Sequence, residues 1–344
     1  MTAEQRGEIL RKGQNMKPVT WGVLSVSTHY RLRVHTYVAK SPLVQMRAVA
    51  SRSPDRAQAF AGEFGFPKAY GSYEELLADK EIEAVYIPLP NHMHAEWVKK
   101  CADAGKHVLC EKPFALNARE AEDAIRYAEK KGVKVMEAFM YRLHPQWQRA
   151  REIVKAGELG AVHSVNTLFT YMLTDPANIR NILSAGGGGI PDIGCYAVST
   201  ARFMMGREPT RVVSLVRRDP AFKTDVLASG ILDFETAQSV FTVGTQTFGW
   251  QKVDVIGTGG EMRVHVPYNA YPDSPMKLTV TTGVGERNIF TPASDQYQQM
   301  FEGFSRAVRG EGDVPTPPQD AINNMKVLDA LFRSEKSGTW EKVG

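Results

Sequence analysis

The first 140 residues alternate short apolar runs with stretches of helical periodicity, and this alternation restricts the fold more than any other feature of the chain. Apolar runs at residues 19–24, 44–50, 84–87, 107–110 and 134–138 are separated by helical patterns at 31–40, 54–64, 73–78, 94–104 and 118–131. Strands joined through helices pair in parallel by right-handed crossovers. We therefore predict a doubly wound α/β domain over residues 18–140, with its ligand at the carboxyl ends of the strands.

A different pattern follows residue 140. Strand patterns at 162–173, 210–217, 227–234, 237–247, 252–256, 262–266 and 277–282 share this half with helical patterns at 145–156, 190–205, 295–308 and 318–335. Consecutive strands favour a large open, mostly antiparallel sheet with helices on one face. Residues 141–344 are therefore predicted to form an α+β domain for substrate binding and oligomerisation. Residues 1–17 are polar and are expected to be a disordered extension.

Charge and cysteine content exclude several classes of function. The formal charge of +4 over 344 residues comes without a Lys/Arg block, so we expect no nucleic-acid partner. The three cysteines form no Cys-x-x-Cys pair, which indicates a reducing, cytoplasmic setting. The sequence shows no membrane-length apolar run and no secretory signal, so no membrane partner is expected. No residues have metal-ligand spacing.

The loop after the first strand stands where a dinucleotide fingerprint, Gly-x-Gly-x-x-Gly/Ala, is expected. The glycines of that fingerprint allow a tight turn and a close approach to the pyrophosphate. Ser25, Ser27 and Tyr30 occupy the three glycine positions here, with Thr28 and His29 between the last two. A serine hydroxyl is small and can donate to a phosphate oxygen. On this stretch alone, a plain turn without a ligand is the better interpretation.

The end of the second strand changes that interpretation. Ser51 and Arg52 follow the strand directly, and Arg56 comes shortly after. Dinucleotide folds place the residue that selects the ribose here, and an acidic residue there binds the 2′-hydroxyl of NAD. A hydroxyl and a guanidinium suit a 2′-phosphate instead. The position favours NADP, with NAD as a possible second cofactor.

Several longer motifs carry a family resemblance. They are Pro90-Asn91-His92-Met93-His94, Glu111-Lys112-Pro113, Glu137-Ala138-Phe139-Met140-Tyr141-Arg142, Gly186-Gly187-Gly188-Gly189-Ile190-Pro191-Asp192-Ile193-Gly194-Cys195-Tyr196, Asp295-Gln296-Tyr297 and Pro315-Thr316-Pro317. With these motifs the chain resembles the Gfo/Idh/MocA oxidoreductases from residue 19 to its C-terminus. The form Asp-Ile-Gly-Cys-Tyr looks like the branch with NADP-dependent xylose dehydrogenases, dimeric dihydrodiol dehydrogenases and glucose–fructose oxidoreductase.

The resemblance implies a Rossmann domain, a second domain with an open-faced sheet, and an NAD(P) cofactor. The residues it places at the cofactor, together with those named above, are Ser25, Ser27, Thr28, His29, Ser51, Arg52, Arg56, Leu89, Pro90, Asn91, His94, Glu111, Lys112 and Ala138. The substrate is expected between the nicotinamide and residues 192–196. The serine-containing loop departs from the family pattern and leaves open how the pyrophosphate is held.

Hydride transfer to or from a carbinol carbon requires a proton to move on the attached oxygen. Within the resemblance we assign Tyr196 as the acid–base group and Lys112 as its activator, because an adjacent ammonium lowers the pKa of a phenol. Direct proton transfer by Lys112 is the alternative. Asp192, four residues before Tyr196, is expected to orient a substrate hydroxyl and to balance Lys112. Arg180 is expected to reach substrate hydroxyls.

These assignments predict an oxidoreductase that acts on a secondary alcohol or carbonyl of a sugar or polyol. Three alternatives remain open: a redox-mediated glycosidase with a tightly bound cofactor, a non-catalytic NAD(P) sensor of the same fold, and a different ligand altogether. By analogy with this fold, a homodimer or homotetramer is expected to form through the C-terminal sheet.

Overall fold

The N-terminal sheet of the computed structural model, which describes residues 17–344, contains six parallel strands in the order β3-β2-β1-β4-β5-β6. They are β1 (Val19–Leu24), β2 (Val44–Ala50), β3 (Lys68–Tyr70), β4 (Ala84–Ile87), β5 (His107–Cys110) and β6 (Val135–Glu137). The strand order reverses between β1 and β4, and ligands of open α/β sheets bind beside the strand ends at this point. The predicted doubly wound fold is confirmed. The predicted extension lies, except for residue 17, outside the described residues.

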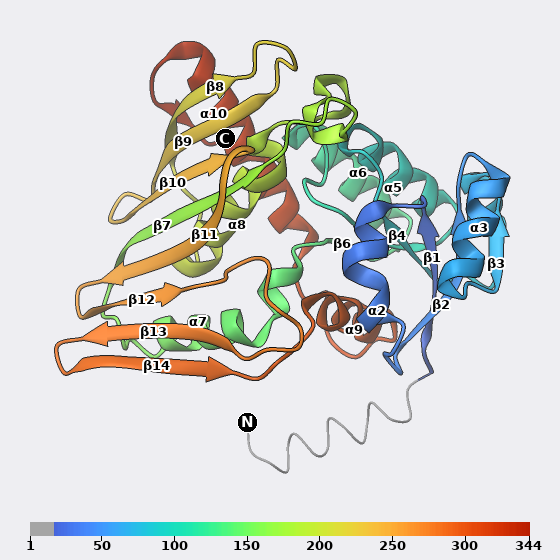
Figure 1. Ribbon diagram of the computed structural model, residues 1–344, viewed down its shortest axis with the longest axis horizontal. Helices are drawn as coiled ribbons and strands as arrows, with labels where there is room; N and C mark the ends of the chain where they lie inside the picture. Colours follow the sequence, from blue (N-terminus) through green and yellow to red (C-terminus); the bar gives the residue numbers. More distant parts are fainter. Residues whose placement is uncertain (1–16) are drawn as a thin grey trace.

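Helices connect these strands (Figure 1), and polar side chains cap three of them. The helices are α2 (His35–Val38), α3 (Pro54–Phe64), α4 (Tyr73–Ala78), α5 (His94–Asp103) and α6 (Ala118–Lys130). The side chains of Ser53, Ser72 and Asn117 accept hydrogen bonds from the first turns of α3, α4 and α6. Such caps satisfy backbone N–H groups that have no partner within the helix.

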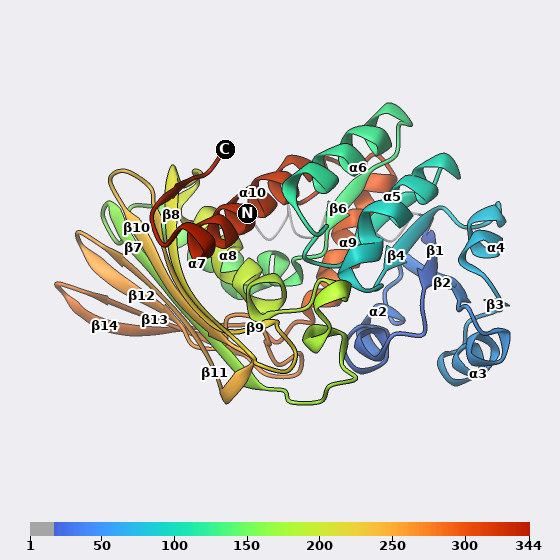
Figure 2. The ribbon, with the colours of Figure 1, turned by 90° about the horizontal axis from the view of Figure 1, so that it is seen from above.

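A nine-stranded sheet forms most of the second half, in the order β14-β13-β12-β11-β7-β10-β9-β8-β15. The strands are β7 (Val162–Met172), β8 (Arg211–Arg218), β9 (Asp225–Asp233), β10 (Gln238–Gly244), β11 (Gln246–Gly257), β12 (Gly260–Val264), β13 (Met276–Thr282), β14 (Gly285–Thr291) and β15 (Glu341–Lys342). Only β7 and β10 pair in parallel. Helices α7 (Pro145–Lys155), α8 (Cys195–Met205) and α10 (Pro318–Ser337) lie on one face, and no helix of residues 17–344 covers the other face (Figure 2).

The last part of the chain returns to the first sheet. Helix α9 (Gln296–Val308) packs against β1, where the Trp21 ring lies 4.7 Å from Phe301 and 5.7 Å from Phe304 between ring centroids. The Trp21 indole N–H donates to Ser305 Oγ at 3.2 Å. Residues 296–308 therefore help to bury the Rossmann sheet, although the sequence pattern places them with the second domain.

Several predicted boundaries are wrong. The helix expected at 31–40 is a wide π-type turn (Tyr30–Val34) followed by the short α2. The strand expected at 237–247 breaks after Gly244, and the next strand, β11, continues through the separately predicted 252–256. Strands β3, β14 and β15 were not predicted, because they are short or carry charged and polar residues without a clear alternation. In residues 17–344 no helix is long and apolar enough to cross a membrane.

Candidate active site

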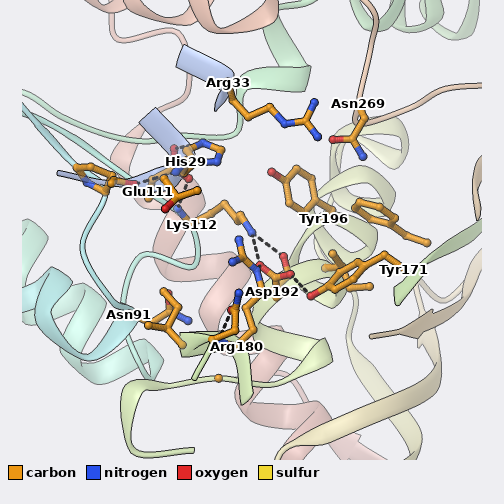
Figure 3. Close-up of a pocket in the computed structure, with 18 of the residues that line it drawn as sticks. His29, Arg33, Asn91, Glu111, Lys112, Tyr171, Arg180, Asp192, Tyr196 and Asn269 are labelled. Carbon is orange, nitrogen blue, oxygen red and sulfur yellow. Dashed lines mark hydrogen bonds and ion pairs between the residues drawn. The ribbon is translucent and has the colours of Figure 1, made fainter. Parts of the chain in front are cut away.

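A cavity of about 1170 Å³ lies where the carboxyl ends of β1, β4 and β5 face the second sheet (Figure 3). Most of the predicted site residues line it. They are Ser25, Ser27, Thr28, His29, Leu89, Pro90, Asn91, Glu111, Lys112, Arg180, Asp192 and Tyr196. The fold thus brings together side chains that are far apart in the sequence, since Ser25 and Tyr196 are separated by 171 positions.

Lys112 enters the cavity from the end of β5 and meets Asp192. Its Nζ atom lies 2.9 Å from Asp192 Oδ1 and 2.7 Å from the Asp192 carbonyl oxygen. The two side chains are only 10% and 12% exposed, so this ion pair is largely shielded from water. Burial works to lower the pKa of Lys112, but the Asp192 carboxylate outweighs it and the pKa lies above its ordinary value. Lys112 is therefore a cation that Asp192 holds in place.

Asp192 also accepts hydrogen bonds from Tyr171, near the end of β7, and from Arg180, which follows that strand. Arg180 Nε lies 3.0 Å from Oδ1, and the Tyr171 hydroxyl lies 2.5 Å from Oδ2. Burial works to raise the pKa of Asp192, but Arg180 and Lys112 outweigh it, so the pKa falls well below its ordinary value. The carboxylate is ionised at neutral pH. Its contacts link Lys112, Arg180 and Tyr171 in one hydrogen-bonded network along one wall of the cavity.

Tyr196 lies beside Lys112, as predicted, but its pKa shifts in the opposite direction. Lys112 Nζ lies 4.9 Å from the centroid of the Tyr196 ring, and the Tyr196 hydroxyl approaches Met140 Sδ at 3.4 Å. Burial, followed by the influence of Tyr297 and Glu111, raises the pKa of Tyr196 well above its ordinary value. The expectation that Lys112 lowers this pKa is wrong, because Asp192 engages the ammonium and desolvation penalises the phenolate.

The loop after β1 keeps the turn of a glycine fingerprint without its glycines. Ser25 has a φ of 115°, a region that favours glycine, and its N–H donates to the Ala50 carbonyl at 3.0 Å. Ser27 Oγ accepts from the backbone N–H groups of His29 and Tyr30 at 3.1 and 3.4 Å. The hydroxyl of Ser27 therefore caps the turn that follows. Tyr30 is fully buried and fills the space of the third glycine.

His29 and Glu111 form a second polar group in the cavity. His29 Nε2 lies 3.5 Å from Glu111 Oε1 and has no hydrogen-bond partner among residues 17–344. Glu111 Oε1 also accepts from the Tyr86 hydroxyl at 2.6 Å. Burial works to raise the pKa of Glu111, but His29, Tyr86 and Lys112 outweigh it and lower the pKa to about 2. This pair lies on the Rossmann side of the site.

Five predicted cofactor residues do not line the cavity. Ser51 is buried, whereas Arg52 and Arg56 are exposed beyond the end of β2. The Tyr73 hydroxyl lies beside both Ser25 and Arg52, so the end of β2 still neighbours the loop.

His94 and Ala138 are fully buried and cannot reach a ligand in the cavity. The two ring nitrogens of His94 bond the carbonyl oxygens of Leu89 and Pro113 at 2.8 and 2.9 Å. His94 therefore joins the two loops that carry Asn91 and Lys112 and acts as a positioning residue. The prediction of direct cofactor contact is wrong for both residues, because their side chains are enclosed by protein.

Further lining residues escaped the sequence interpretation. Those with polar or aromatic side chains include Arg33, Tyr171, Trp250, Gln251, His265, Asn269, Tyr271 and Tyr297. Tyr171 stands near the end of a predicted strand, and Arg33 stands in a predicted helix, so both positions were compatible with structural roles. The sequence contains no signal that these segments meet at one cavity.

A dinucleotide fits the donor set on the Rossmann side. The loop approaches the cavity through small hydroxyl side chains, and His29 lines the same region beside Glu111. Asn91 and Glu111 continue the lining along the sheet edge, as NAD(P) would require. Within residues 17–344, no group of three His, Cys, Asp or Glu side chains could hold a metal ion.

Comparison with known proteins agrees with this geometry. Residues 26–139 match the model of an oxidoreductase family with an NAD-binding Rossmann fold, and residues 147–263 match the GFO/IDH/MocA C-terminal domain. A D-xylose 1-dehydrogenase (NADP(+)) from Haloferax volcanii is 41% identical over 297 residues, which cover 85% of this chain and 90% of the relative.

A dTDP-3,4-didehydro-2,6-dideoxy-alpha-D-glucose 3-reductase from Actinomadura kijaniata is 30% identical over 324 residues, covering 92% of this chain and 96% of the relative. The crystal structure of KijD10, a 3-ketoreductase from the same organism in complex with NADP and TDP-benzene, superposes with a TM-score of 0.87 at 26% identity. The superposition covers 92% of this chain and 98% of that one. From these matches over both domains, the chain belongs to the GFO/IDH/MocA family of NAD-binding oxidoreductases.

Proposed function

We propose that the protein is an NADP-preferring oxidoreductase that interconverts a secondary alcohol and a carbonyl of a sugar or polyol. The observation that carries this proposal is the meeting of Lys112, fixed by Asp192, with the Tyr196 ring at the dinucleotide edge of the Rossmann sheet. The Haloferax dehydrogenase and the Actinomadura reductase, both named for sugar substrates, support the substrate class.

The protein side chains have distinct roles in this proposal. Bound NADP supplies or accepts the hydride. In carbonyl reduction, Tyr196 donates a proton to the carbonyl oxygen, since its raised pKa keeps the hydroxyl protonated at neutral pH. Lys112 Nζ hydrogen-bonds the same oxygen, and Asp192 fixes Nζ and orients a substrate hydroxyl together with Arg180. Direct proton transfer by Lys112 is the alternative assignment.

The preference for NADP rests on the end of β2. Arg52 is exposed there, and Ser51 and Arg52 directly follow the strand, where an acidic residue would accept the hydroxyls of an NAD ribose. A guanidinium forms strong bidentate hydrogen bonds with phosphate oxygens. Arg52→Ala is therefore expected to weaken NADPH binding much more than NADH binding, measured by fluorescence titration. Equal effects on the two nucleotides contradict this assignment.

The central experiment compares the wild type with Lys112→Met and Tyr196→Phe. Nicotinamide fluorescence measures NADPH binding, and nicotinamide absorbance measures turnover on a panel of aldoses and polyols that includes D-xylose. We expect both variants to bind NADPH and to lose turnover. Near-normal turnover by Lys112→Met refutes the mechanism, and absence of NADPH binding by the wild type refutes the cofactor. Release of sugar from a glycoside without net absorbance change indicates a glycosidase instead.

We further propose that the uncovered face of the large sheet forms a homodimer or homotetramer interface. On this face Leu215, Val240 and Ile256 are 79%, 38% and 36% exposed on β8, β10 and β11, with β9 between the first two strands and β7 between the last two. Apolar side chains gathered on a sheet face are typical of subunit contacts. Sedimentation of Leu215→Glu should show a smaller species than the wild type; a monomeric wild type refutes the interface.

A further inference from the structure

One cation of the cavity has no counter-ion. Arg33, on the turn Tyr30–Val34, lines the cavity and forms no ion pair or hydrogen bond with any other residue in the range 17–344. Lys112 and Arg180, the other two cations of the lining, share the Asp192 carboxylate. The side chain of Arg33 is therefore free to bind a ligand.

Asn269 faces Arg33 from the second domain. Its backbone N–H and that of Tyr268 donate to Gln251 Oε1 at 3.2 and 3.0 Å, which fixes this part of the loop. The side-chain amide of Asn269 has no hydrogen-bond partner in the described part of the chain. Figure 3 shows Arg33 and Asn269 directed toward each other, across Tyr196 from Asp192. The same loop is tied to α2 through the Tyr37 hydroxyl and Asp273 Oδ2 at 2.6 Å.

The two ends of the cavity therefore offer different chemistry to a substrate. At one end, Lys112 and Arg180 both contact the Asp192 carboxylate, so each of these cations already has a partner, and the carboxylate and ammonium can hydrogen-bond sugar hydroxyls. At the other end, a guanidinium and an amide have unsatisfied donors. A guanidinium fork matches the oxygens of a carboxylate or phosphate, and an unbalanced cation in a cleft attracts anions.

We propose that the substrate is an anionic sugar, whose carboxylate or phosphate is held by Arg33 and Asn269 while its reacting carbon lies at Lys112 and Tyr196. This inference rests on the proposed function and specifies its substrate class. It makes Arg33 a residue that determines specificity.

Titration calorimetry of the NADP⁺-saturated protein tests this inference with three probes: D-glucose, D-glucuronate and D-glucose 6-phosphate. We expect at least one anionic sugar to bind about 10-fold or more tightly than D-glucose, and the two anions distinguish carboxylate from phosphate recognition. Arg33→Met should weaken binding of the preferred anion by about 10- to 100-fold and change binding of D-glucose by less than about 2-fold.

Arg31→Met is the matched control. Arg31 lies on the same turn but pairs with Glu63 at 2.8 Å and does not line the cavity, so its removal should leave the affinity for all three sugars unchanged. The inference is overturned if neither anion binds more tightly than D-glucose, or if Arg33→Met weakens all three equally. It is also overturned if Arg33→Met weakens NADPH itself in a fluorescence titration, because Arg33 then serves the cofactor. Failure of the proposed function is seen separately, as a wild type that binds no NADPH.

Discussion

The backbone of Ser25 gives a sharp test of the loop geometry. Its φ of 115° costs a non-glycine residue about 1–3 kcal/mol. Where the backbone conformation is an ordinary one, a protein with glycine at that position is instead about 0.5–1 kcal/mol less stable than one with alanine, because glycine loses more backbone entropy on folding. Ser25→Gly and Ser25→Ala both remove the hydroxyl and its contact with Tyr73, so only the backbone effect separates them. We expect Ser25→Gly to exceed Ser25→Ala in free energy of unfolding by about 1 kcal/mol.

Urea unfolding followed by circular dichroism measures this difference, and thermal unfolding should place the glycine variant about 1–2 °C above the alanine variant. The comparison does not depend on cofactor or substrate. If the alanine variant is as stable as the glycine variant, or more stable, the loop does not keep the turn of a glycine fingerprint. The interpretation of Ser25 as a substitute for the first glycine would then be refuted.

Three further predictions concern the loop, the core and the site. Ser27→Ala removes the acceptor for two backbone N–H groups and should lower the free energy of unfolding by about 1 kcal/mol in a urea titration; an unchanged value contradicts the cap. Burial raises the pKa of Glu137 to about 8, so the folded protein keeps a proton that the unfolded chain releases, and stability falls as pH rises from about 4.5 to 8. Urea titrations at the two ends of this pH range measure the fall in free energy of unfolding. Glu137→Gln should make that fall smaller than in the wild type, and an identical fall contradicts the raised pKa of Glu137. Asp192→Asn removes the largest influence that opposes burial at Lys112 and lowers its pKa, so the basic limb of kcat/KM against pH should move to lower pH; an unmoved limb shows that Lys112 does not set it.

Local sequence patterns were sufficient to predict most strands of the Rossmann domain. Strands β1, β2, β4 and β5 occur at the predicted residues, because each is a short buried run that must hydrogen-bond within a sheet. The motifs at Lys112, Asp192 and Tyr196 correctly identified residues that line one cavity. Prediction was weaker where strands are polar, as in β14, and where burial excluded a side chain from the cavity, as for His94 and Ala138.

The sequence by itself determined the alternation of strands and helices, the family, and the residues with reactive side chains at the strand ends. Only the tertiary structure decided how those side chains affect one another. Lys112 meets Asp192 across 80 residues of chain, and burial, with Tyr297 and Glu111 nearby, raises the Tyr196 pKa that Lys112 was expected to lower. The physical reason is that periodicity reports local hydrogen bonding and the burial of one face. Desolvation and Coulomb interactions depend instead on distances between segments that the sequence order does not encode.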